Sequence, residues 1–132
     1  MIKGLALATT LLVTPAVAET IIITKDDGGY IFEYYSRYMQ YNVHATTVIL
    51  DGICWSACTM VVIVKDSCTT ERGLLAFHAA RDVKTGKSPA PLIRAQLDYY
   101  PKPVREAIQR RGGLTAEWMF MPASEFLPIC NG

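Results

Sequence analysis

Residues 20–29 read TIIITKDDGG, and this stretch decides the fold. The consecutive β-branched residues predict a short strand that is covered on both faces, as strands of parallel sheets are. The Asp-Asp-Gly-Gly sequence after them is a turn signal, so the strand should end there. Beyond the turn, apolar and aromatic residues at 31, 34, 35, 38 and 39 have the spacing of one helical face. A strand, a glycine turn and a helix are therefore expected.

Two further apolar runs extend this pattern. Residues 46–50 (TTVIL) predict a second strand, and residues 74–77 (LLAF) predict a third that leads directly into His78. Periodicity does not decide the structure of residues 60–64 (MVVIV), but a helix is favoured, because parallel strands need a crossover and Ser56 could cap it. This order predicts an α/β fold with a mostly parallel sheet and crossover helices.

The remainder of the chain is less regular. Residues 81–91 combine charges, glycine and prolines, which predicts a mobile loop. Residues 92–100 and 104–111 predict two short helices, the first ending at Pro101 and the second at Gly112. Residues 118–130 are apolar without a clear period, so an irregular tail is expected there.

The first 18 of the 132 residues have the three parts of a secretory signal peptide. Lys3 precedes an apolar stretch at 5–13, and Pro15 and the triplet AVA follow. The apolar stretch is shorter than the about 20 residues that a membrane span needs. We expect cleavage after Ala18, a periplasmic or secreted location, no stable membrane insertion afterwards, and a single domain over residues 19–132.

The net charge of the chain argues against nucleic acid as a partner. The full chain has 13 basic and 12 acidic residues, and removing Lys3 with the leader leaves twelve of each. A formally neutral domain gives no bulk electrostatic reason to bind nucleic acid.

Four cysteines follow the leader: Cys54, Cys58, Cys68 and Cys130. Export would bring them into an oxidising compartment, so two disulfides are expected, with all three pairings open. Their spacings do not follow the paired C-x-x-C layout of structural zinc sites, and we predict no metal and no cofactor. A thiol redox role is a further alternative if Cys54 and Cys58 are unpaired.

Three features suited to take part in a chemical reaction follow three successive predicted strands. These are the Gly28-Gly29 turn, Ser56 and His78. The carboxyl ends of parallel strands meet at one edge of a sheet, so these residues should lie together. A serine hydroxyl becomes nucleophilic when a histidine takes its proton, and backbone amides, here those of Gly29 and Ala57, can stabilise the resulting oxyanion.

The segments that carry these features resemble a known family. They are Asp27-Gly28-Gly29 before a helix, residues 52–58 (GICWSAC) and residues 73–80 (GLLAFHAA). The chain resembles small secreted or periplasmic bacterial proteins with a Clp-protease-like (crotonase-like) fold.

The resemblance implies that Gly28 and Gly29 form the oxyanion loop, Ser56 is the nucleophile and His78 is the base. Ala57 would provide the second amide. Clp-type proteases place an aspartate well downstream of the histidine, where this chain offers only Glu117 and Glu125.

Two functions of different classes follow. The first is an exported serine hydrolase or peptidase that acts on a peptide or another acyl substrate. The second is a non-catalytic binding or assembly module that keeps the fold and is stabilised by disulfides. Clp proteases form rings, and assembly of this chain into a homo-oligomer stays open.

Overall fold

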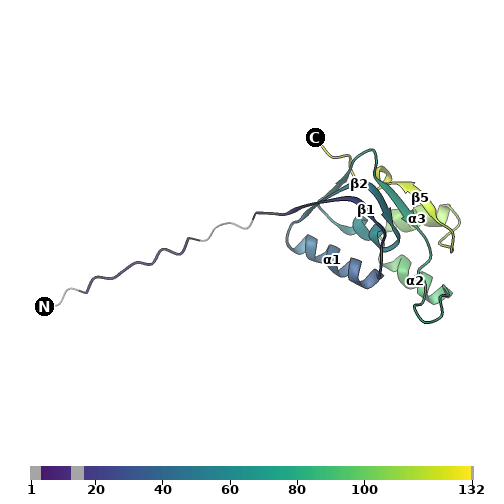
Figure 1. Ribbon diagram of the computed structural model, residues 1–132, viewed down its shortest axis with the longest axis horizontal. Helices are drawn as coiled ribbons and strands as arrows, with labels where there is room; N and C mark the ends of the chain where they lie inside the picture. Colours follow the sequence, from purple (N-terminus) through teal and green to yellow (C-terminus); the bar gives the residue numbers. More distant parts are fainter. Residues whose placement is uncertain (1–3, 13–16, 132) are drawn as a thin grey trace.

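The computed structural model describes residues 4–12 and 17–131. Residues 4–12 lead away from the folded part of the chain (Figure 1), and their leucines are fully exposed. Residues 1–3 and 13–16 of the expected signal peptide lie outside the described residues. The helices formed by the described residues include no candidate membrane span.

A five-stranded, mostly parallel sheet forms the centre of the structure. Its strands are β1 (Thr20–Asp26), β2 (Thr47–Trp55), β3 (Ser67–Thr69), β4 (Leu74–Phe77) and β5 (Met119–Pro122). The main order is β1-β2-β4-β5, with β3 paired beside β2. Strands β1, β2, β3 and β4 make parallel pairs, whereas β5 runs antiparallel to β4. The predicted mixed α/β fold with a mostly parallel sheet is therefore confirmed.

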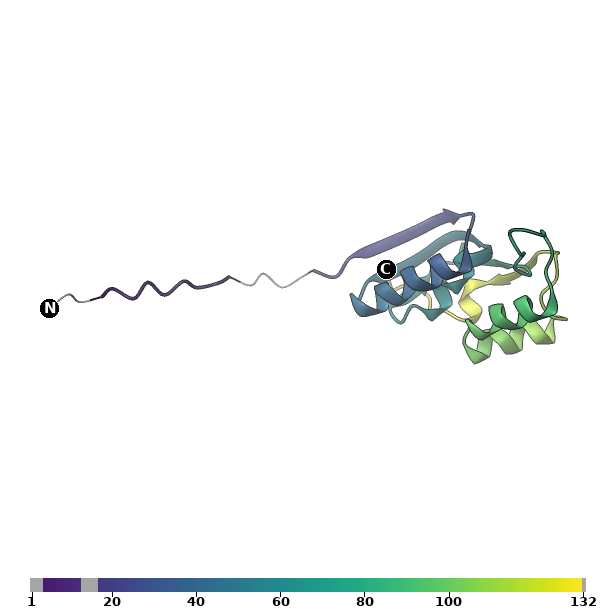
Figure 2. The same cartoon turned by 90° about the horizontal axis from the view of Figure 1, so that it is seen from below.

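The helices lie on one side of this sheet (Figure 2). They are α1 (Ile31–Val43), the 3-10 helix η1 (Ser56–Ile63), α2 (Ala90–Asp98), α3 (Lys102–Arg110) and the short 3-10 helix η2 (Ala123–Glu125). The chain advances from β1 to β2 to β4 in one direction, so right-handed crossovers place α1 and η1 on the same face. The core fills the space between, and Tyr38, Leu50, Phe77 and Tyr100 are among its largest buried side chains.

Three details differ from the sequence-based expectations. The segment predicted as a helix at 60–64 is a tighter 3-10 helix that begins at Ser56. Trp55 holds its N-cap position without a side-chain hydrogen bond, so the prediction that Ser56 caps it is wrong. The tail expected to be irregular contains β5, because pairing with β4 compensates for the absence of a clear period.

Strand β1 is also less covered than predicted. It lies at one end of the strand order, and Ile22 in its middle is 59% exposed. The interpretation of residues 21–24 as covered on both faces is therefore wrong, because the helices pack against only one face of the sheet.

Both expected disulfides are present, and their pairing is now defined. Cys54 bonds to Cys58, and Cys68 bonds to Cys130. No cysteine in the described part of the chain is free. Two cystines are compatible with the oxidising environment of an exported protein.

Candidate active site

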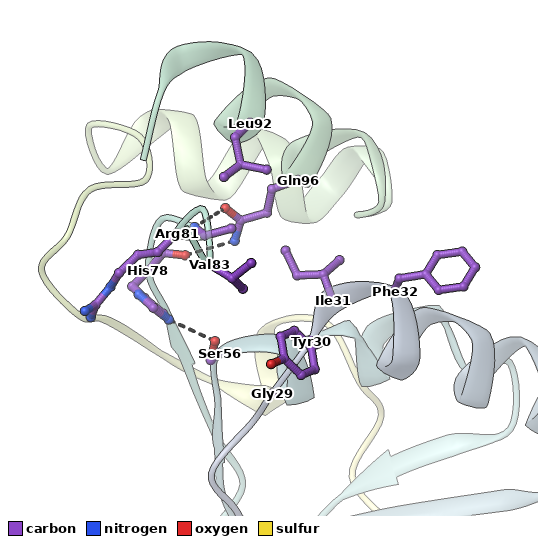
Figure 3. A pocket seen from close by; sticks show the side chains of 11 residues that line it. Gly29, Tyr30, Ile31, Phe32, Ser56, His78, Arg81, Val83, Leu92 and Gln96 are labelled. Atoms are coloured by element: carbon purple, nitrogen blue, oxygen red, sulfur yellow. Dashed lines mark hydrogen bonds between the residues drawn. The ribbon is translucent and has the colours of Figure 1, made fainter. Parts of the chain in front are cut away.

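The structure brings Ser56 and His78 into direct contact. Ser56 follows β2, His78 follows β4, and these two strands are parallel neighbours. The Ser56 hydroxyl oxygen lies 2.8 Å from Nε2 of His78, as Figure 3 shows. This distance is within the reach of a general base.

The backbone of Ser56 has an unusual conformation. Its φ of 54° lies in the left-handed region, which non-glycine residues rarely adopt. The Cys54–Cys58 cystine encloses this residue, with Cα atoms 5.3 Å apart, and the Thr59 hydroxyl donates a hydrogen bond of 2.6 Å to the carbonyl of Ser56. A sharp strand-to-helix turn also presents the nucleophilic serine in α/β hydrolases.

The Gly28 turn packs directly against this serine. A Cβ atom on Gly28 would lie 2.5 Å from the Trp55 carbonyl oxygen and 2.8 Å from Cβ of Ser56. With a φ of 83°, this position requires glycine for both space and backbone conformation. Asp26 fixes the turn, since its carboxylate accepts hydrogen bonds from the Gly28 amide at 2.8 Å and the Tyr34 hydroxyl at 2.6 Å.

Two backbone amides near the serine are available as donors. The same hypothetical Gly28 Cβ would lie 3.2 Å from the amide nitrogen of Ala57, so the turn and this amide adjoin each other. Ala57 lies in the first turn of η1, where backbone amides have no partner within the helix. The Gly29 amide donates no hydrogen bond to another described residue.

No carboxylate of the described residues is hydrogen-bonded to His78. Its Nδ1 is buried and has no hydrogen-bond partner among the described residues. The ring instead stacks beside Trp118, with ring centroids 4.2 Å apart. Burial, and after it the positive charge of Arg81, holds the pKa of His78 below its usual value of 6.5. The imidazole is therefore neutral near pH 7, which is the form that accepts a proton.

Neither the two glutamates considered as a third member, Glu117 and Glu125, nor the nearby Asp82 orients His78. Glu125 pairs with Arg111 at 2.7 Å. Asp82 accepts hydrogen bonds from the Lys84 and Thr85 amides within its own loop. Glu117 follows Thr115 in an exposed turn and forms no hydrogen bond with the His78 Nδ1 atom.

Gln96 of α2 supports the histidine and was missed by the sequence analysis. Its side-chain amide donates to the His78 carbonyl at 2.9 Å and accepts from the Ala80 amide at 2.7 Å. Gln96 is a polar residue, but it is buried, because it lies on the same helical face as the apolar residues Ile93 and Tyr100. A polar residue on the apolar face of a predicted helix was the available signal.

A second hydrogen bond holds the serine side of the site. The Thr59 hydroxyl already donates to Ser56, so the buried Tyr100 hydroxyl donates to Thr59 at 2.6 Å. Burial raises the pKa of Tyr100 to about 12, which keeps it protonated as a donor. Buried polar side chains thus fix the backbone on both sides of the Ser56–His78 contact.

Replacing Gln96 tests this support. We expect Gln96→Leu to lower the free energy of unfolding by about 1–3 kcal/mol, because the partly buried His78 carbonyl and Ala80 amide lose their hydrogen-bond partner. Urea unfolding followed by circular dichroism measures the change. Gln109→Leu, on an exposed face of α3, is the matched control. Equal stability of the wild type and both variants would contradict a supporting role for Gln96.

A cavity of about 440 Å³ adjoins the serine and the histidine. Ser56, His78 and Gly29 line it together with apolar side chains, among them those of Ile31, Val83 and Leu92 (Figure 3). Arg81 and Gln96 add polar groups to the lining. The site can therefore accept an apolar group beside the Ser56 hydroxyl.

Comparison with known proteins adds no assignment. No protein-family model matches the chain, and no curated protein matches it significantly. The function of the Ser56–His78 site therefore has to be argued from its own geometry.

Proposed function

We propose that this protein is an exported serine hydrolase or peptidase of Clp-like fold that uses Ser56 as nucleophile and His78 as base. The observation that supports it most is the 2.8 Å contact between the Ser56 hydroxyl and Nε2 of His78 at a serine with left-handed backbone. Histidine is the side chain best suited to take a serine proton near neutral pH.

The reaction has two halves. Nε2 of His78 takes the hydroxyl proton while the Ser56 oxygen bonds to the substrate carbonyl carbon. The amides of Gly29 and Ala57 would donate hydrogen bonds to the resulting oxyanion. His78 then gives its proton to the leaving group, and an acyl group remains on Ser56. Water deprotonated by the same imidazole releases the acid and restores the hydroxyl.

The surroundings of His78 limit the rate. Before Nε2 accepts the serine proton, Nδ1 of the neutral ring carries the hydrogen, and this N–H has no acceptor among the residues that the structure describes. In serine proteases, losing the orienting carboxylate slows turnover by about 10⁴-fold. We therefore expect slow hydrolysis, with acylation of Ser56 easier to detect than turnover.

The cavity indicates the kind of substrate. Its apolar side chains favour an acyl group or peptide side chain that is itself apolar, since burying such a group removes it from water. Activated esters report on this chemistry without knowledge of the natural substrate. We expect p-nitrophenyl hexanoate to be hydrolysed faster than p-nitrophenyl acetate, and Ser56→Ala to lose both activities.

Two outcomes of this ester assay would overturn the proposal. One is hydrolysis that persists in Ser56→Ala, which would place the reaction elsewhere. The other is no hydrolysis and no acyl-enzyme in folded wild-type protein that contains both disulfides. The control is Ser124→Ala, which removes a serine of η2 that does not line the cavity.

The pH dependence should follow His78. Only the neutral imidazole accepts the proton, so kcat/KM should rise with pH through the lowered His78 pKa and become constant above 6.5. Arg81→Gln removes the positive charge that contributes to this lowering, which should move the midpoint to higher pH but leave it below 6.5, since burial remains. Ester hydrolysis at a series of pH values measures both midpoints. A midpoint above 6.5, or the same midpoint in both proteins, would contradict the assignment.

One observation favours the second candidate, a non-catalytic binding or assembly module. The unpartnered Nδ1 leaves His78 without the group that orients it in serine proteases. Under this alternative, Ser56→Ala and His78→Ala leave any cellular phenotype intact, whereas removing the cystines abolishes it. Loss of the phenotype in Ser56→Ala at unchanged stability would exclude this alternative.

A further inference from the structure

Strand β1 offers an edge that no described residue pairs with. It has β2 on one side only, and Figure 2 shows it as the outermost strand. Thr20, Ile22 and Thr24 are exposed along it. Free edges with β-branched residues are templates for pairing with another strand. We propose that a second copy of this chain pairs with β1 antiparallel about a two-fold axis, which joins the two sheets.

The hydrogen bonds to β2 define which backbone groups face this free edge. The Thr47 amide donates to the Glu19 carbonyl at 2.9 Å, and Thr20 lies opposite Thr47 in the parallel register. Backbone groups in a strand alternate in direction, so residues 19, 21 and 23 point toward β2. The amides and carbonyls of Thr20 and Ile22 therefore point outward. At Thr24 only the amide does so, because the register with β2 shifts between Ile23 and Lys25 and the Thr24 carbonyl lies against Gly52 of β2.

These outward groups fit a symmetric antiparallel pair. With Ile22 opposite the partner's Ile22 on the two-fold axis, Thr20 lies opposite the partner's Thr24, and the reverse holds on the other side. The Ile22 pair exchanges two hydrogen bonds, and each Thr24 amide donates one to the partner's Thr20 carbonyl, which makes about four in total. The two Ile22 side chains lie on the same face and would cover each other, which removes the most exposed apolar side chain of the strand from water.

Charge selects this register over its neighbours. In the central register, Glu19 lies opposite the partner's Lys25, which makes two opposite-charge pairs. A shift of two residues in one direction places Glu19 opposite the partner's Asp27, where like charges repel. The opposite shift places Glu19 opposite the partner's Ile23 and loses both charge pairs. Lys25 has only a loose 3.8 Å contact with the exposed Asp27, so it is free to form the new pair.

A proline tests the outward hydrogen bonds. The Ile22 amide faces the free edge, so Ile22→Pro removes a donor to the partner without removing a bond to β2. We expect the wild type and Ile22→Val to have the mass of a dimer in multi-angle light scattering, and Ile22→Pro that of a monomer. Unchanged circular dichroism would show that the variant is folded. A monomeric wild type, or a dimeric Ile22→Pro, would overturn the proposal.

Charge-reversal variants of Lys25 and Glu19 test the register independently of the proline variant. Lys25→Glu should raise the dimer dissociation constant about tenfold, because it places one glutamate opposite the Glu19 of each partner and so makes two like-charge pairs. Combining it with Glu19→Lys should restore the wild-type value, once intact mass confirms equal N-termini. Equal dissociation constants for the wild type and Lys25→Glu would overturn this register. Dimerisation does not rest on the proposed catalysis, so failure of either leaves the other standing.

Discussion

The double variant Cys68→Ala, Cys130→Ala is expected to lose about 4 kcal/mol of unfolding free energy. The two cysteines are separated by 62 positions, so their bond removes much of the chain entropy of the unfolded state. It also ties down the tail, where the Cys130 amide donates to Thr69 and the Thr69 amide donates to Pro128. This tail contains Trp118, which stacks on His78, so the bond also supports the site. Urea unfolding under oxidising conditions measures the loss.

The other cystine is the matched control. Cys54 and Cys58 are only four positions apart, and the same entropy relation gives about 2 kcal/mol for their removal. Removing the Cys54–Cys58 bond should reduce activity more than stability, since this bond encloses Ser56. If removing Cys54–Cys58 destabilised the protein more than removing Cys68–Cys130, the chain-entropy explanation would be wrong.

Hydrolysis of p-nitrophenyl hexanoate by His78→Ala is expected to be about 10²- to 10⁴-fold slower than by the wild type. Without the imidazole, no described side chain is hydrogen-bonded to the Ser56 hydroxyl to take its proton. The alanine side chain is too short to reach Ser56, so water or an empty space takes the place of the base and the rate falls further. Initial rates under identical conditions measure the ratio.

The chain provides a matched control for this variant. It has only one other histidine, His44, which follows the last residue of α1, away from the carboxyl ends of the strands. His44→Ala should hydrolyse the ester at the wild-type rate. Loss of activity in both histidine variants, or in neither, would contradict the role assigned to His78.

Local patterns were sufficient for the parts of the fold with strong periodicity. The strand at 74–77 was predicted with its observed bounds, and the helix after the glycine turn begins at Ile31 as expected. Strand β5 was missed because its residues, MFMP, acquire their conformation from pairing with β4 rather than from their own pattern. The exposure of Ile22 was missed for a related reason, since a run of β-branched residues does not indicate its place in the sheet.

The contact between Ser56 and His78 follows from the order of the strands, and this order was predicted from the sequence. Parallel neighbours bring the residues after their ends together, whatever the details of packing. The left-handed backbone of Ser56 and the role of Gln96 could not be predicted. Both depend on groups distant in sequence, the Gly28 turn in one case and the His78 and Ala80 backbone in the other.

The nucleophilicity of Ser56 can be measured directly with a fluorophosphonate probe, followed by location of the adduct by tandem mass spectrometry. A serine activated by His78 should carry the probe on Ser56, with no label in Ser56→Ala and much slower labelling in His78→Ala. Folded wild-type protein with both disulfides formed that takes up no probe on Ser56 would contradict the assignment of this serine as a nucleophile.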